Sequence, residues 1–142
     1  MKILLIDQYG DLGGGQHCLI EAAAGFWARG WELHAAIPGE GRLASKLAPY
    51  CACIHAIPCG PFSSTRKTAG DIVRFAAQVP VQTMILRKIV GRAGIQALYV
   101  NGPRVLPAAA FARGSSPLLF HAHWDVPQRS AARLVRWSRR LS

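Results

Sequence analysis

The pattern of hydrophobic and polar positions divides this chain into two kinds of segment, which alternate along it. Short apolar runs typical of buried strands are separated by longer stretches with helical periodicity, and turn residues lie between them. The expected strands are residues 2–7, 32–37, 53–57, 96–100 and 117–121. Strands that alternate with helices usually form βαβ units, so the pattern predicts an α/β fold: a Rossmann-like parallel sheet with helices on both faces.

Helical periodicity predicts helices over residues 16–29, 41–47, 71–90 and 105–113, and a basic amphipathic helix over residues 129–140. Cys18 is placed on the apolar side of the first helix, and Gly30 in the position of a left-handed cap. The inner face of that helix is expected to consist of Leu19, Ile20, Ala23, Phe26 and Trp27. Pro80 is expected to break or kink the third helix, and residues 61–67 form a polar, turn-rich loop.

A glycine-rich loop, residues 10–15, lies between the first strand and the first helix. A strand followed by such a loop and a helix presents backbone N–H groups to an anion, so the loop predicts a phosphate-bearing ligand. Its spacing, G-x-x-G-G-G, matches neither G-x-G-x-x-G nor a P-loop. The alternative is a tight turn whose glycines only allow the helix to pack closely on the strand. The candidate anion-binding residues are Gly13, Gly14, Gly15 and Gln16.

Polar residues also follow the fourth and fifth expected strands. Asn101 follows one strand, and His121, His123 and Asp125 lie at the end of the other. Ligands collect outside the carboxyl ends of parallel strands, so these side chains are expected beside the glycine loop. A histidine there can donate a hydrogen bond, act as a general acid or carry positive charge near a phosphate, with Asp125 to orient it. The alternative is that either histidine has only a structural role and forms its hydrogen bonds with backbone groups at the end of the strand.

The composition, 142 residues of which 51% are hydrophobic, suits one domain. No apolar run approaches the roughly 18 residues of a membrane span, and the first strand is too short for a signal peptide, so we expect a cytoplasmic protein. The four cysteines, with His55 among them, do not have paired C-x-x-C spacing. We therefore expect reduced, partly buried thiols and no metal at Cys18, Cys51, Cys53 and Cys59.

Positive charge is concentrated in the second half of the chain. Residues 1–65 carry four basic and five acidic side chains, whereas residues 66–142 carry thirteen Lys or Arg and two Asp. The basic residues with helical spacing or near a helix end are Arg87, Lys88, Arg92, Arg129, Arg133, Arg136 and Arg140. They can form a solvated face, or contact anionic lipid or nucleic acid. Nucleic acid is the weakest of these readings, because no helix-turn-helix signature or aromatic-and-basic interleaving is present.

The order of these motifs resembles glycosyltransferase family 4. The matching segments are residues 2–6, 13–16, 28–33, 38–44 with Leu47, 97–101 and 117–125, so the resemblance covers essentially the whole chain. It implies a retaining GT-B enzyme, in which two Rossmann-like domains face each other across a cleft. The N-terminal domain of such an enzyme binds the acceptor, and the C-terminal domain holds the sugar nucleotide.

The resemblance also implies roles for the candidate residues. Residues 13–16 match the loop that approaches the donor diphosphate, and His123 matches the histidine near the donor sugar and the acceptor, which makes it the candidate catalytic residue. Asn101, His121 and Asp125 would lie on the acceptor side, although Trp124 separates Asp125 from His123, which departs from the family's pattern.

The chain carries no E-x7-E element for a sugar nucleotide and no second domain, so we expect residues 1–142 to be one incomplete N-terminal domain, inactive by itself. Its expected partners are a nucleotide-sugar co-substrate, a glycan or lipid-linked acceptor, and an anionic surface at the inner face of the membrane, with no metal or other cofactor. The alternative is a stand-alone Rossmann-like module that binds a phosphorylated ligand or a partner protein.

Overall fold

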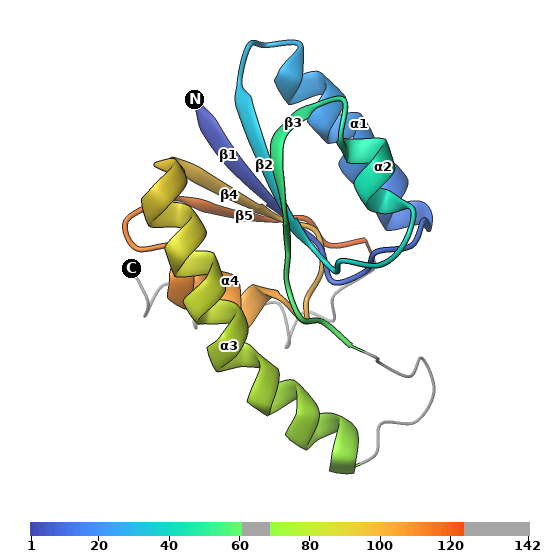
Figure 1. The fold of residues 1–142 in the computed structure, drawn as a ribbon, viewed down its shortest axis with the longest axis vertical. Helices are drawn as coiled ribbons and strands as arrows, with labels where there is room; N and C mark the ends of the chain where they lie inside the picture. The colour runs from blue at the N-terminus through green and yellow to red at the C-terminus, as the bar shows by residue number, and fades with distance from the viewer. Residues whose placement is uncertain (61–68, 124–142) are drawn as a thin grey trace.

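A five-stranded parallel sheet forms the centre of the computed structural model, which describes residues 1–60 and 69–123 (Figure 1). The strand order is β3-β2-β1-β4-β5, and each neighbouring pair is parallel. The strands are β1 (Lys2–Ile6), β2 (Glu32–Ile37), β3 (Cys51–Ala56), β4 (Ala97–Val100) and β5 (Leu118–Phe120). This architecture confirms the predicted parallel α/β class.

Helices cover both faces of the sheet, as predicted. Alternate residues of β1 point to opposite faces: Ile3 and Leu5 pack in one apolar cluster, and Leu4 and Ile6 in another. The first cluster includes α1 (Gly14–Trp27) and α2 (Leu43–Leu47), and the second includes α3 (Ala69–Ala93) and α4 (Leu106–Ala112). The central strands β2, β1 and β4 are therefore buried on both sides, which explains their continuous apolar runs, whereas the edge strands β3 and β5 are more exposed.

The boundaries of the elements differ from the prediction by up to three residues. Helix α1 begins two residues earlier than expected, at Gly14, and ends at Trp27. Gly30 has a φ of +74°, which confirms the predicted left-handed position.

Two side chains of α1 were assigned to the wrong side of the helix. Cys18 is exposed, and Trp27 is 56% exposed, whereas Leu19 and Ala23 are fully buried. One residue turns the helix by about 100°, so the position before Leu19 leaves the buried stripe, and Trp27 lies at its border in the last helical position. Trp27 instead contacts the ring of Tyr50 edge to face.

Helix α3 continues through Pro80, so of the break or kink expected there, the break is absent. The proline ring removes one hydrogen bond to the carbonyl of residue 76, and because Ala76 is exposed, water can take that acceptor. Within residues 1–60 and 69–123, no helix combines the length and hydropathy required of a membrane span. The loop predicted over residues 61–67 lies outside the described residues.

Candidate functional site

The candidate site lies at the carboxyl ends of β1 and β4, which are neighbours in the sheet. From β1 the chain crosses to β2 on one side, and from β4 it crosses to β5 on the other. This reversal of direction is a topological switch point, where open α/β sheets bind their ligands. The glycine loop follows β1, and Asn101 directly follows β4.

The N-terminus of α1 presents amide groups that have no hydrogen-bond partner among residues 1–60 and 69–123. Gly13 is the N-cap, with extended φ and ψ of −147° and −175°, and no side chain caps the helix. The first helical bond runs from the His17 N–H to the Gly13 carbonyl oxygen, at 3.1 Å. The N–H groups of Gly14, Gly15 and Gln16 therefore have no partner inside the helix, and they lie at the positive end of its dipole.

Asp7 lies beneath this loop, fully buried, at the end of β1. Its carboxylate accepts hydrogen bonds from the Gln16 side-chain amide at 3.0 and 3.2 Å, from Asn101 Nδ2 at 2.6 Å and from the backbone N–H of Tyr9 at 2.9 Å. Asn101 Nδ2 also donates to the Gly15 carbonyl oxygen at 3.0 Å. These bonds tie the ends of β1 and β4 to the first turn of α1.

His123 joins the same network from the segment after β5. Its Nε2 lies 2.7 Å from Asn101 Oδ1. Because the Asn101 amide group donates to Asp7, its oxygen faces His123 and must receive a proton from Nε2. The network therefore selects the tautomer with Nε2 protonated, which leaves Nδ1 as the nitrogen that can accept a proton or a hydrogen bond.

Gly15 allows this approach because it has no side chain. A Cβ atom at Gly15 would lie 3.0 Å from His123 Cδ2 and 3.2 Å from Nε2, closer than ordinary contact. At Gly14 a Cβ would meet nothing within 4 Å. Of these two glycines, only Gly15 is needed for the position of the imidazole.

The environment shifts the pKa of both ionisable ends of this network. Burial raises the pKa of Asp7, although hydrogen bonds from Asn101, Tyr9 and Gln16 act in the opposite direction. Burial, followed by the neighbouring His121, lowers the pKa of His123, while the Asp7 charge opposes that shift. The lowered pKa favours the neutral form of His123, which can act as a hydrogen-bond acceptor or a base.

His121 lies beside His123, with ring centroids 4.1 Å apart. Its Nδ1 forms a short hydrogen bond with the hydroxyl of Tyr99, a largely buried residue of β4. The bond fixes the orientation of the His121 ring.

The structure brings together most of the residues predicted for the cleft: residues 13–16, Asn101, His121 and His123. Asp125 lies outside the described residues, as do Arg129, Arg133, Arg136 and Arg140. Arg87, Lys88 and Arg92 are exposed on α3, in the part of the helix that precedes β4, and so belong to a different surface.

Sequence reasoning missed Asp7 and Tyr99. Asp7 was assigned to the first strand as an ordinary residue, although a carboxylate directly after four apolar residues and before a glycine loop signals a buried polar position at the strand end. Tyr99 had no such signal, because its partner is 22 residues away.

The four cysteines are free thiols. Burial raises the pKa of Cys51 and of Cys59 to about 11, so both are protonated at neutral pH. Cys51 and Cys59 are partly buried, as predicted, whereas Cys18 and Cys53 are exposed, so that prediction was wrong for these two thiols.

The sequence matches no protein-family model and no curated protein. Solved structures resemble its fold. MurG of Acinetobacter baumannii has a TM-score of 0.65 and 18% identity, over 95% of this chain and 38% of MurG. HepE of Anabaena, solved in complex with UDP and glucose, has a TM-score of 0.60 and 22% identity, over 99% of this chain and 35% of HepE.

The glycotransferase of kitacinnamycin has a TM-score of 0.68 and 15% identity, over 96% of this chain and 34% of that protein. This chain has the fold of a GT-B domain. At these identities the likeness shows the fold alone, and the chain spans only a little more than a third of each of the three proteins. The C-terminal domain of a Pyrococcus furiosus hydrogenase shares the fold as well, with a TM-score of 0.62 and 13% identity over 84% of this chain and 90% of that domain.

Proposed function

We propose that this chain is the acceptor-side, N-terminal domain of a retaining glycosyltransferase of family 4, which transfers a sugar from a nucleotide-sugar donor to a glycan or lipid-linked acceptor. The observation that carries the proposal is the convergence of free helix amides and a hydrogen-bonded histidine at the switch point of the sheet. The complex of HepE with UDP and glucose supports a nucleotide-sugar ligand for this fold. The motif order described above supports family 4 and a retaining transfer.

In this proposal the amides of Gly14, Gly15 and Gln16 approach the donor diphosphate, which a second domain holds from the other side of the cleft. Helix N-termini favour negative charge because of their dipole and their unpaired N–H groups. The Asp7 carboxylate does not oppose the diphosphate directly, because it is buried beneath the loop and accepts bonds from Gln16 and Asn101.

His123 is the proposed catalytic residue, facing the donor sugar and the acceptor. Its bond to Asn101 holds the ring over Gly15 and leaves Nδ1 available to a sugar hydroxyl. Asn101 acts mainly as a positioning residue, and His121 is proposed to contact the acceptor, with its ring oriented by Tyr99. Asp125 is also proposed to lie on the acceptor side, and the support for this role is the resemblance to glycosyltransferase family 4.

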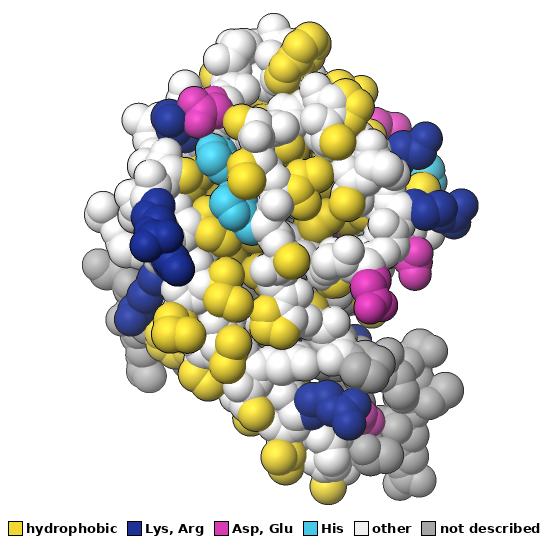
Figure 2. Space-filling view, in the orientation of Figure 1, with side chains coloured by type: hydrophobic (Ala, Val, Ile, Leu, Met, Phe, Trp, Pro, Cys, Tyr) yellow, Lys and Arg dark blue, Asp and Glu magenta, His cyan; other side chains and the backbone are white. Residues whose placement is uncertain are grey.

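We also propose that α3 docks the domain on an anionic membrane surface, where a lipid-linked acceptor would be found. Met84, Arg87 and Lys88 share an exposed face of the helix at spacings of three and four residues, and Val81 lies one turn before them. Hydrophobic side chains follow α3 along the lower part of the molecule in Figure 2, and Lys and Arg side chains lie beside its upper part. Exposed apolar and cationic groups on one helix are the combination that binds a lipid interface.

A substitution at Gly14 tests the diphosphate contact while keeping the fold. Gly14 occupies the first helical position, where proline is well tolerated, and the extended backbone of Gly13 suits a residue before proline. Gly14→Pro removes one amide donor, and Gly14→Ala is the matched control that keeps it. We expect UDP to shift the amide resonances of residues 14–16 in the ¹⁵N-labelled wild type and in Gly14→Ala, and to bind Gly14→Pro more weakly.

Uridine, which lacks the diphosphate, is the ligand control and should leave those resonances in place. Equal shifts with uridine and UDP would contradict a diphosphate contact. No shift with UDP at any concentration up to its solubility would contradict the proposed donor site.

A further inference from the structure

A second group of side chains lies on β2 and β3, apart from the switch point. His34 of β2 pairs with Cys53 of β3, and Ala36 pairs with His55. The register shifts between Leu33 and His34, so that Ala52 has no partner in the ladder. Cys53 and His55 are two residues apart in one strand and therefore share a face, the face on which Ala36 packs toward α3.

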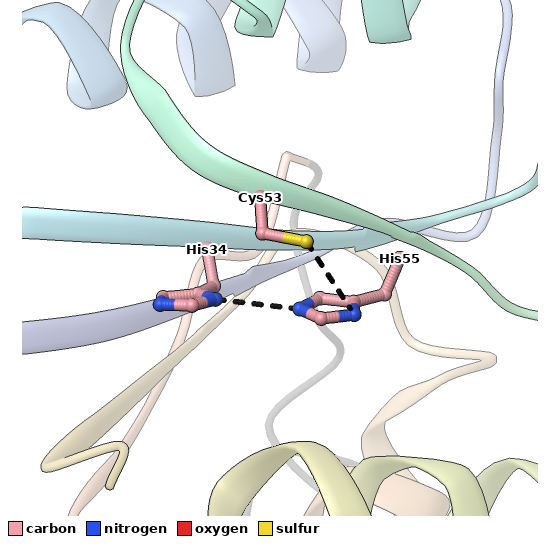
Figure 3. Close-up of side chains that lie close together, drawn as sticks. All are labelled: His34, Cys53 and His55. Atoms are coloured by element: carbon pink, nitrogen blue, oxygen red, sulfur yellow. Dashed lines mark hydrogen bonds between the residues drawn. The ribbon is translucent and has the colours of Figure 1, made fainter. Parts of the chain in front are cut away.

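The ligand atoms of these three side chains converge (Figure 3). His34 Nδ1 lies 3.3 Å from His55 Nε2, and Cys53 Sγ lies 3.9 Å from His55 Nδ1. One nitrogen or sulfur atom from each residue falls within 4.8 Å of the other two. Two imidazole nitrogens and one sulfur bound to a tetrahedral zinc ion would be separated by roughly 3.3–3.8 Å, given bonds of about 2.0–2.3 Å.

A carboxylate orients one of the two imidazoles. His34 Nε2 lies 3.1 Å from Glu32 Oε1, and Glu32 is held in turn by Lys2 Nζ at 2.9 Å. A carboxylate accepts, so Nε2 carries the proton and the lone pair of Nδ1 points into the cluster. A carboxylate behind a histidine ligand is the arrangement that fixes the tautomer in protein metal sites.

We propose that His34 Nδ1, the Cys53 thiolate and one nitrogen of His55 bind a divalent transition metal, with zinc favoured by this mixed set of nitrogen and sulfur ligands. On binding, the Cys53 thiol releases its proton to solvent and a metal–sulfur bond forms. Since β3 is the edge strand, the ion would join the edge of the sheet to β2.

Three protein ligands leave one coordination position for a solvent molecule. Histidine side chains are visible at the surface over β2 and β3 in Figure 2. Cys53 is exposed, and His55 also lines a groove of about 400 Å³ against α3, together with Lys88 and Arg92. The ion and its fourth ligand can therefore enter from solvent. Cysteine spacing predicts no metal, but it does not reveal His34, which reaches this cluster from the neighbouring strand.

Cobalt(II) is the probe for this site, because a bound thiolate gives it a charge-transfer band in the near ultraviolet. We expect the reduced 142-residue chain to bind one Co²⁺ per molecule with that band, and Zn²⁺ to displace the cobalt. Cys53→Ser should lose the band, and His34→Gln and His55→Gln should weaken binding. Glu32→Gln should weaken it by roughly 10- to 100-fold.

Cys51→Ser is the matched control, because Cys51 precedes Cys53 by two residues in β3 but, owing to the register shift at Ala52, packs with the cluster on the opposite face of the sheet. It should keep the cobalt band and the increase in Tm on adding Zn²⁺, whereas Cys53→Ser should show neither. The proposal is overturned if the wild type gives no thiolate band, or if Cys51→Ser loses the band as Cys53→Ser does. No nucleotide is present in this experiment, so its result is independent of the proposed transferase function.

Discussion

Gly15 is the residue on which the position of His123 most directly depends. Gly15→Ala should keep the helix, since alanine is favoured there by up to about 1 kcal/mol, but its Cβ would push the imidazole away from Asn101. We expect the pKa of His123 to rise toward its ordinary value, because burial is the main cause of its depression. NMR titration of the histidine Cε1–H resonances measures this change.

Gly14→Ala provides the comparison, since its Cβ meets no neighbour. The His123 titration should be unchanged in that variant. An identical pKa of His123 in Gly15→Ala and the wild type would show that the ring does not lie against Gly15.

Asp7 is the residue that holds the ends of β1 and β4 together, so its charge state should affect stability. Gln16 and Asn101 both donate hydrogen bonds to the Asp7 carboxylate. In Asp7→Asn, one of these donors would face the N–H group of the new amide, and a buried unpaired polar group costs about 1–3 kcal/mol. We expect the free energy of unfolding from urea denaturation to fall by about that amount at neutral pH.

The pH dependence of this difference has a definite sign. Burial raises the pKa of Asp7 in the folded state, so the native protein binds this proton more tightly than the unfolded chain does. The contribution of Asp7 to stability is therefore greatest below its ordinary pKa of 3.8 and declines as the pH rises through the raised value. As the pH rises from 3.8 through the raised pKa, the unfolding free energy of the wild type minus that of Asp7→Asn should therefore fall. A difference that increased with pH would contradict a raised pKa.

Among the elements, α3 carries the surface that we propose for membrane docking. Replacing Arg87, Lys88 and Arg92 by Gln removes three exposed charges, each worth about 1 kcal/mol near an anionic bilayer, so vesicle binding should weaken on the order of 100-fold. Co-sedimentation with vesicles of anionic and neutral lipid at low salt measures the effect.

The matched control replaces Arg29, Arg42 and Lys46, which are also exposed but lie on the part of the molecule around α1 and α2. That variant loses the same charge and should retain most of the binding. Docking through α3 would be refuted by equal losses in the two variants, or by a wild type that does not distinguish anionic from neutral vesicles.

At the scale of the whole molecule, this domain forms one wall of the proposed cleft. Sugar transfer requires donor and acceptor to be held together in the correct geometry, which accounts for a large part of such a rate enhancement. We therefore expect no turnover of UDP-sugars by the purified 142-residue chain in a radiolabel transfer assay. Sustained transfer above the rate without protein, abolished in His123→Ala, would disprove the assignment to one half of a two-domain enzyme.

The sequence by itself determined the parallel α/β class, the order of the elements and the edge of the sheet at which the glycine loop, Asn101 and His123 meet. Local periodicity defines strands and helices, and the carboxyl ends of parallel strands share one edge. Only the tertiary structure decided which side chains touch. The bond from Asn101 to Asp7 joins residues 94 positions apart. Likewise, the approach of His34 to His55 depends on strand order and on a register shift in β3. Such contacts arise from the pairing of whole strands, which no local pattern encodes.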